Sequence, residues 1–168
     1  FFTFFGMLPF YFSGSIDTIT NAFFETMSGF TTTGATILDD IESLSHGMLF
    51  WRSLTQWIGG LGIVFFTIAI LPIFTTGGVQ LFSAESTGVT HDRTHPKINV
   101  MAKWLWTIYL VLTVSETVLL MFGGMSLFDA ICQSFATTAT GGYSTKQNSI
   151  SYWNSPYIEY VVAIFMIV

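Results

Sequence analysis

The sequence predicts an all-α membrane protein built from repeated units, each a membrane span, a short helix that enters the membrane without crossing it, and a second span. Three observations predict this fold class. The 168 residues are 51% hydrophobic and only 9% charged, whereas soluble domains carry about 25% charged residues. Two apolar segments are long enough to cross a bilayer, and two others are too short. The same order of segments occurs twice along the chain.

The first unit is expected over residues 1–74. Its first residues are the end of a span, followed by a short helix over 18–29, a polar loop over 31–36 and a full span over 48–74. A spanning helix needs about 20 apolar residues. The short helix has about three turns, and a Thr at its start is a suitable cap. It can therefore only dip into the membrane.

The second unit is expected over residues 98–168. It begins with a span over 98–122, which Gly123 and Gly124 end. A second short helix over 127–137, a polar loop over 138–144 and the start of a last span over 157–168 complete it. Aligning Gly34 with Gly142, at an offset of 108 residues, matches the short helices, the loops and the spans in one register. We therefore interpret the two units as an internal repeat.

A polar loop over 75–97 joins the two units. Three of the five Lys and Arg residues lie in it or beside it, namely Arg93, Lys97 and Lys103. Loops rich in Lys and Arg face the cytoplasm. The loop is therefore predicted to be cytoplasmic, and both short helices enter the membrane from outside.

Each short helix is followed by a run of Thr and Gly that is out of place in so apolar a chain. The runs are F-T-T-T-G-A-T over Phe30–Thr36 and F-A-T-T-A-T-G-G-Y-S over Phe135–Ser144. Non-helical backbone at membrane depth survives only where protein buries it or where it lines a wet cavity. Carbonyls and Thr hydroxyls can replace the water shell of a cation, and Gly permits the positive φ that aims them. The two runs are predicted to be ion-filter loops.

Both runs can be compared with the T-V-G-Y-G filter of potassium channels, which makes the predicted fold potassium-channel-like. The second run keeps Thr140, Gly142 and Tyr143 in place. The first keeps a Thr and the central Gly34. Two such matches in register, each after a helix that cannot span, favour a filter over two polar surface turns.

Two charged residues stand near the first loop. Arg52 lies about one turn into the predicted span, where it either snorkels to the interface or holds the surround of the filter through buried carbonyls or Glu25. Glu25 either raises cation occupancy through its field or binds neighbouring backbone, and the second role is favoured. A direct ion-ligand role for Arg52 is not expected, since a guanidinium would repel the ion.

Four stretches of the chain resemble the Trk/Ktr/HKT superfamily of potassium transporters, and within it the TrkH/TrkG potassium uptake proteins. They begin with F-F-E-T-M-S-G-F-T-T-T-G-A-T over Phe23–Thr36 and F-W-R-S-L-T-Q-W-I-G-G-L-G-I over Phe50–Ile63. A-E-S-T-G-V-T-H-D-R over Ala84–Arg93 and S-F-A-T-T-A-T-G-G-Y-S over Ser134–Ser144 follow. The resemblance covers essentially the whole chain.

The resemblance implies four units around one central pore, of which this chain holds parts of the first two. Because both ends fall inside apolar runs, a piece of a longer chain is expected. The implied ion-binding residues are Thr32, Thr33, Gly34, Thr140, Gly141 and Gly142. K⁺ is expected at Thr33, Gly34, Gly141 and Gly142, and filter support is expected from Glu25, Arg52 and Tyr143.

The expected function is K⁺ uptake through this filter, in a multi-pass protein of the bacterial inner membrane. K⁺ is the transported ion, and no cofactor is expected. The resemblance further implies a homodimer of full-length subunits, surrounding lipid and a cytosolic nucleotide-binding regulatory subunit of the TrkA/KtrA type. The net charge of −5 gives no support for nucleic-acid binding.

Three alternatives remain open. One is a Na⁺/K⁺ cation transporter of the same superfamily. Another is an intramembrane enzyme, which would need an acid, a base or a nucleophile at membrane depth, where Glu116 and Ser115 have no obvious partner. The last is a non-transporting membrane bundle, which would not require two aligned loops of this kind. The chain is expected not to be an enzyme.

Overall fold

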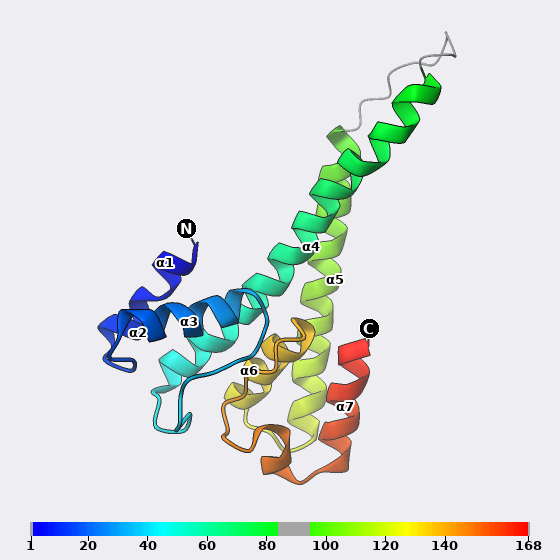
Figure 1. The fold of residues 1–168 in the computed structure, drawn as a ribbon. Coiled ribbons are helices and arrows are strands. Elements are labelled where there is room, and N and C mark those ends of the chain that lie inside the picture. The colour runs from blue at the N-terminus through cyan, green and yellow to red at the C-terminus, as the bar shows by residue number, and fades with distance from the viewer. Residues whose placement is uncertain (1, 84–94, 168) are drawn as a thin grey trace.

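The computed structural model describes the backbone of residues 2–83 and 95–167, and the side chains of residues 2–66 and 100–167. In this part of the chain every regular element is helical, which confirms the all-α class. The elements are α1 (Phe2–Gly6), α2 (Leu8–Phe12), α3 (Ile19–Phe30), α4 (His46–Ser83), α5 (His95–Phe122), α6 (Leu127–Thr138), the 3₁₀ helix η1 (Ser149–Trp153) and α7 (Pro156–Ile167). Figure 1 shows α4 and α5 as two long helices side by side, with the shorter elements gathered around one end.

The predicted end of a span at the N-terminus is divided into α1 and α2 by a turn at Met7. Pro9 follows two residues later and has no backbone N–H to continue the helical ladder. Hydrogen bonds from Met7 N to Thr3 O and from Tyr11 N to Met7 O, 3.0 and 3.1 Å long, nevertheless join the two pieces. The segment therefore keeps the direction of one interrupted helix.

Both short helices are present within a residue of their predicted ends, and each has 12 residues. Thr18 Oγ1 accepts from Asn21 N at 3.4 Å, and Ser126 Oγ accepts from Asp129 N at 3.1 Å. Each side chain thus satisfies a backbone donor that the helix leaves free at its start. A helix of this size is about 18 Å long and cannot cross a hydrocarbon core of about 30 Å.

The long helices extend further than the sequence predicted. Residues 75–97 were expected to be a loop, but α4 continues to Ser83 and α5 begins at His95. Helix propagation adds one hydrogen bond for each residue fixed, and Pro96 is well tolerated in a first turn. The central residues of the expected loop, 84–94, lie outside the described residues.

One segment among the described residues has the length and composition of a membrane span, Val100–Phe122 within α5. Large apolar side chains on its surface are exposed, among them Trp104, Val111 and Val118. An apolar helix surface of this length is typical of contact with lipid. The span predicted over 48–74 lies within α4 and continues past residue 66, the last of that helix whose side chain is described, so it stays a prediction.

Two apolar clusters hold the short helices in place. One packs Met7, Phe10, Ile16, Ala22 and Met48 between the N-terminal segment, α3 and α4. The other packs Leu120, Met125, Ala130, Ile158, Val161 and Val162 between α5, α6 and α7. Because α6 also lies against α4, it connects the helices before residue 84 to those after residue 94.

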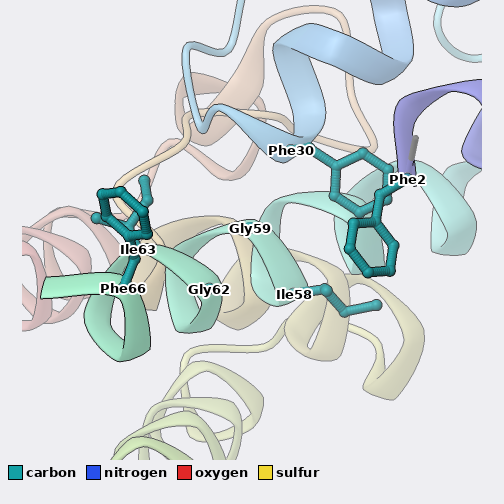
Figure 2. Close-up of a pocket in the computed structure, with 7 residues that line it drawn as sticks. All are labelled: Phe2, Phe30, Ile58, Gly59, Gly62, Ile63 and Phe66. Carbon is teal, nitrogen blue, oxygen red and sulfur yellow. The ribbon is translucent and has the colours of Figure 1, made fainter. Parts of the chain in front are cut away.

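Glycines of α4 let the first short helix approach closely. A Cβ atom at Gly59 would collide with the backbone of Phe30, the last residue of α3. Beside this contact lies an apolar pocket of about 390 Å³, shown in Figure 2 and lined by Phe2, Phe30, Ile58, Gly59, Gly62, Ile63 and Phe66. The first polar loop therefore starts directly on the surface of α4.

We expect Gly59→Ala in the full-length chain to lower the free energy of unfolding by roughly 1–3 kcal/mol, the usual cost of overpacking. Gly47→Ala in the first turn of α4 is the matched control, because a Cβ there meets nothing within 4 Å. The control should be neutral or stabilising by up to about 1 kcal/mol through helix propensity. Thermal unfolding of both purified variants checks this, and equal midpoints would contradict the close contact.

Candidate functional site

Equivalent backbone hydrogen bonds join each polar loop to the end of the helix before it. Thr33 N donates to Ser28 O at 3.0 Å, and Gly141 N donates to Ala136 O at 2.8 Å. The offset between the two bonds is the 108 residues of the sequence register. Each bond spans the last helical turn and satisfies a carbonyl that would otherwise lack a partner at the helix end.

Both loops continue with positive φ at equivalent positions. The angles are 54° at Thr32 and 76° at Gly34 in the first loop, and 51° at Thr140 and 83° at Gly142 in the second. Positive φ was predicted only for glycines, but Thr32 and Thr140 also adopt it. A β-branched residue in this region is uncommon, and strained positions of this kind cost about 1–3 kcal/mol and cluster at functional sites.

The two loops touch through their backbones. A Cβ atom at Gly34 would collide with the carbonyl oxygen of Gly141, and one at Gly141 would collide with the side-chain amide of Gln56 on α4. Gly34 is therefore required by space, since it meets backbone, whereas a side chain at Gly141 would have to displace the end of the Gln56 side chain. All six predicted ion-binding residues lie in this pair of adjoining loops, whereas the predicted support residues Glu25 and Arg52 lie on α3 and α4.

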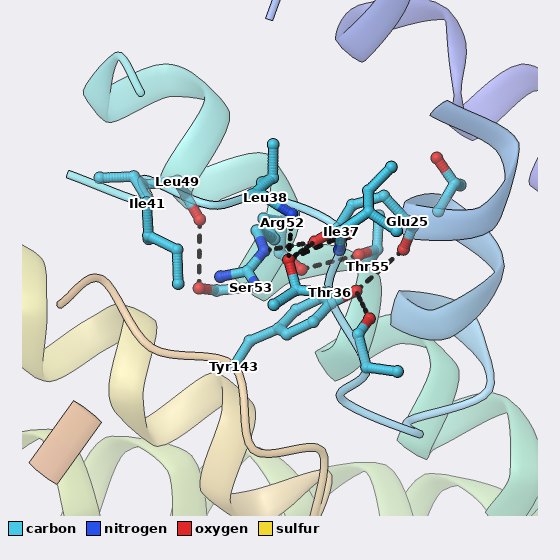
Figure 3. A network of polar contacts seen from close by, with 12 residues as sticks. Glu25, Thr36, Ile37, Leu38, Ile41, Leu49, Arg52, Ser53, Thr55 and Tyr143 are labelled. Carbon is cyan, nitrogen blue, oxygen red and sulfur yellow. Dashed lines mark hydrogen bonds and ion pairs between the residues drawn. The ribbon is translucent and has the colours of Figure 1, made fainter. Parts of the chain in front are cut away.

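Behind the first loop lies a buried ion pair. Arg52 Nε is 2.7 Å from Glu25 Oε1, and the two side chains are 2% and 0% exposed. Arg52 Nη1 also donates to the carbonyl oxygen of Ser144 at 3.1 Å, and its guanidinium lies 3.7 Å from the centre of the Tyr143 ring. Figure 3 shows this network. With so little exposed surface, Arg52 does not snorkel in this structure.

The Glu25 carboxylate supports the back of the first loop. Thr36 Oγ1 donates to it at 2.9 Å, and the backbone N–H of Ile37 donates at 3.1 Å. These contacts agree with the favoured interpretation that Glu25 binds neighbouring backbone. In the second unit Gln133 takes the equivalent position, and its Oε1 has no hydrogen-bond partner among the described residues.

Tyr143 ties the second loop to the first. Its hydroxyl lies 2.9 Å from the carbonyl oxygen of Glu25 and 3.3 Å from that of Ala35. Burial, and then the nearby Glu25 carboxylate, raise the pKa of this hydroxyl above its ordinary value. It therefore stays protonated and can donate to either carbonyl.

Two partners in this network were not predicted from the sequence. Gln56, whose side chain is buried, accepts from Tyr143 N at 3.2 Å through Oε1. The Ser144 carbonyl receives Arg52. A Gln within a predicted span is itself a signal, since polar residues at membrane depth are usually functional or paired. A backbone carbonyl leaves no such signal in the sequence.

We expect Arg52→Met in the full-length protein to lower stability by about 3–5 kcal/mol, the cost of leaving one partner of a buried ion pair uncompensated. The double variant Glu25→Met/Arg52→Met should recover part of this loss. Lys146→Met is the control, because Lys146 pairs with Glu42 at 3.5 Å at the surface and should cost less than about 1 kcal/mol. Thermal unfolding measures these variants together with Glu25→Met alone, and a loss in the double variant equal to the sum of the two single losses would contradict the coupling.

The amino-acid sequence of the chain matches one known protein family. The model of the TrkH family, described as cation transport protein, matches residues 2–168. The chain is 52% identical over 165 residues to the Trk system potassium uptake protein TrkH of Escherichia coli K12, covering 97% of this chain and 34% of that protein. It is 40% identical over 149 residues to TrkG of the same strain, covering 88% and 31%.

A solved structure of a TrkH protein also matches the chain. The crystal structure of the potassium transporter TrkH from Vibrio parahaemolyticus superposes with a TM-score of 0.81 at 39% identity, covering 97% of this chain and 32% of that one. The chain therefore spans about a third of the length of the relatives it matches. Together, the match over nearly all of its residues and the shared fold show that the chain belongs to the TrkH family of cation transport proteins.

Proposed function

We propose that the two adjoining loops are two strands of a K⁺ selectivity filter, and that the protein carrying them takes up K⁺. The observation that carries the proposal is the matched pair of loops, with positive φ at Thr32 and Gly34 and again at Thr140 and Gly142. Such a backbone can aim several carbonyls toward one path. K⁺ would bind at Thr33, Gly34, Gly141 and Gly142.

The domain organisation follows from the same repeat. Residues 1–74 and 98–168 are proposed as two units of span, re-entrant pore helix, filter loop and span. The equal lengths of α3 and α6, their caps and the equivalent bonds at their C-terminal ends support this. Glu25, Arg52 and Tyr143 are proposed as filter support, since they join the first loop to the second.

The transported ion is proposed from the relatives, which are described as potassium uptake proteins and as a potassium transporter. Transport of both Na⁺ and K⁺ is the second candidate, favoured by a first loop that keeps only part of the T-V-G-Y-G pattern. The family is one of transport proteins, and we propose no enzymatic reaction for this chain.

Localisation and partners rest on family resemblance. The relatives are named as potassium uptake proteins of the Trk system of bacteria, and the bacterial inner membrane is the proposed location. The exposed apolar surface of α5 is suited to contact with its lipid. A homodimer of full-length subunits and a cytosolic nucleotide-binding regulatory subunit of the TrkA/KtrA type remain proposals.

We expect Gly142→Ser to lower the K⁺ preference over Na⁺ by about tenfold or more, which corresponds to about 1.4 kcal/mol of lost binding free energy. A Cβ at Gly142 meets nothing within 4 Å, so the effect would come from its φ of +83°. Gly34→Ser should be more severe, because its side chain would also collide with Gly141. K⁺ uptake by cells lacking other K⁺ uptake systems, with and without competing Na⁺, measures this in the full-length chain.

Gly124→Ser is the matched control for Gly142→Ser. Gly124 has a φ of +94° and equally open space for a Cβ, but it lies between α5 and α6, outside both loops. The two substitutions therefore carry the same kind of backbone strain. If they changed ion preference equally, or if neither Gly142→Ser nor Gly34→Ser changed it, the filter assignment would be wrong.

A further inference from the structure

Gln56 is a buried amide in the middle of one face of α4. Its exposed fraction is 0%. It follows Arg52 by four residues and precedes Gly60 by four, and residues at this spacing lie above one another on a helix. This face of α4 therefore presents a guanidinium, an amide and a glycine in one row.

The second polar loop follows this row from one end to the other. At the end of the loop, Arg52 donates to the carbonyl oxygen of Ser144 at 3.1 Å. At its start, a Cβ atom on Gly60 would lie 2.9 Å from the Cβ atom of Ala139, which is closer than an ordinary contact. The middle of the loop is left for Gln56.

Two contacts join Gln56 to the middle of the loop. Its Oε1 accepts from the backbone N–H of Tyr143 at 3.2 Å. Its side-chain amide also lies against Gly141, where a Cβ atom would overlap it. The carbonyl oxygen of Gly141 in turn lies against Gly34 of the first loop. Gln56 thus contacts the second loop at the place where the two loops meet.

Hydrogen-bond chemistry determines which end of the Gln56 amide holds the loop. A backbone N–H can only donate, so it must face the amide oxygen and not the amide nitrogen. The nitrogen, Nε2, makes no hydrogen bond among the described residues. The oxygen is therefore the atom through which Gln56 binds Tyr143.

This bond also sets the direction of the neighbouring carbonyl. The N–H of Tyr143 and the C=O of Gly142 belong to one planar trans peptide, in which the two groups point in opposite directions. Because the N–H is directed at α4, the Gly142 carbonyl is directed away from α4. Gly142 has a φ of +83°, a conformation in which glycine by itself has several alternatives.

We propose that Gln56 is a positioning residue that aims the Gly142 carbonyl away from α4 and into the ion path. The proposal rests on the proposed filter function, in which Gly142 is one of the residues that bind K⁺. A carbonyl aimed in advance can replace part of the water shell of the ion without having to turn when the ion arrives. Gln56 thereby contributes to ion preference without touching the ion.

Amide hydrogen exchange in the purified full-length protein tests the bond without any transport measurement. Magnetic resonance of protein labelled at tyrosine nitrogen follows the Tyr143 amide, which is identified by the loss of its signal in Tyr143→Phe. We expect this amide to be protected in the wild type and to exchange about tenfold faster or more in Gln56→Met, which keeps the volume but removes the acceptor. An unprotected amide in the wild type, or equal exchange in the two proteins, would overturn the proposal.

Uptake assays test the positioning role. Gln56→Met should lower the K⁺ preference over Na⁺ by about fivefold or more, because a buried donor without a partner allows the peptide to turn. Gln56→Glu keeps an oxygen acceptor and replaces only the unpartnered Nε2, so its preference should fall by no more than about twofold. Equal losses in the two variants, or an unchanged preference in Gln56→Met, would overturn the positioning role.

Ser53→Ala is the control for loss of a buried polar group from α4. Ser53 is 2% exposed, and its Oγ donates to the carbonyl oxygen of Leu49 in its own helix at 3.1 Å. The substitution should lower thermal stability and leave ion preference unchanged. If it changed preference as much as Gln56→Met, the role assigned to Gln56 would be wrong. Absence of K⁺ uptake by the wild type would refute the proposed function instead, and the exchange measurement would still decide whether Gln56 holds Tyr143.

Discussion

The buried ion pair between Glu25 and Arg52 is the interaction on which the rest of the site depends. Removing two charges from water costs several kcal/mol for each ion, and attraction between them offsets this only when their remaining hydrogen-bonding groups are also satisfied. Here the carboxylate also accepts from Thr36 and Ile37, and the guanidinium also binds the Ser144 carbonyl and stacks on Tyr143. Each of these partners belongs to a loop, so satisfying the charges also determines where both loops lie.

The need to satisfy the buried charges of Glu25 and Arg52 makes the two loops one structural unit. Tyr143 of the second loop reaches the carbonyls behind the first, and Gly34 lies directly against Gly141, where no side chain would fit. Irregular backbone at membrane depth needs neighbours that replace water as hydrogen-bond partners. In this chain each loop provides such neighbours for the other, and Gln56 of α4 adds a further one.

Polar contacts also organise the helices around the loops. Trp57 of α4 donates to Thr113 of α5, and Thr117 lies within hydrogen-bonding distance of Ser134 on α6. In lipid, helices associate through close packing and bonds of this kind, because the surrounding chains are as apolar as the side chains themselves. A sequence with 9% charged residues thus uses hydroxyls and amides in place of charges at these contacts, and the Arg52–Glu25 ion pair is a buried exception.

The sequence alone predicted the order of the longer helices, the limits of α3 and α6 to within one residue, and the 108-residue register that relates the two loops. Apolar length, helix caps and Thr/Gly composition are local properties, so they can be read without a structure. Only the tertiary structure decided that Arg52 binds Glu25 and Ser144, that Thr32 and Thr140 take positive φ, and that α4 and α5 extend into the predicted loop. Arg52 and Ser144 are 92 residues apart, and no local pattern specifies a contact that packing of distant helices creates.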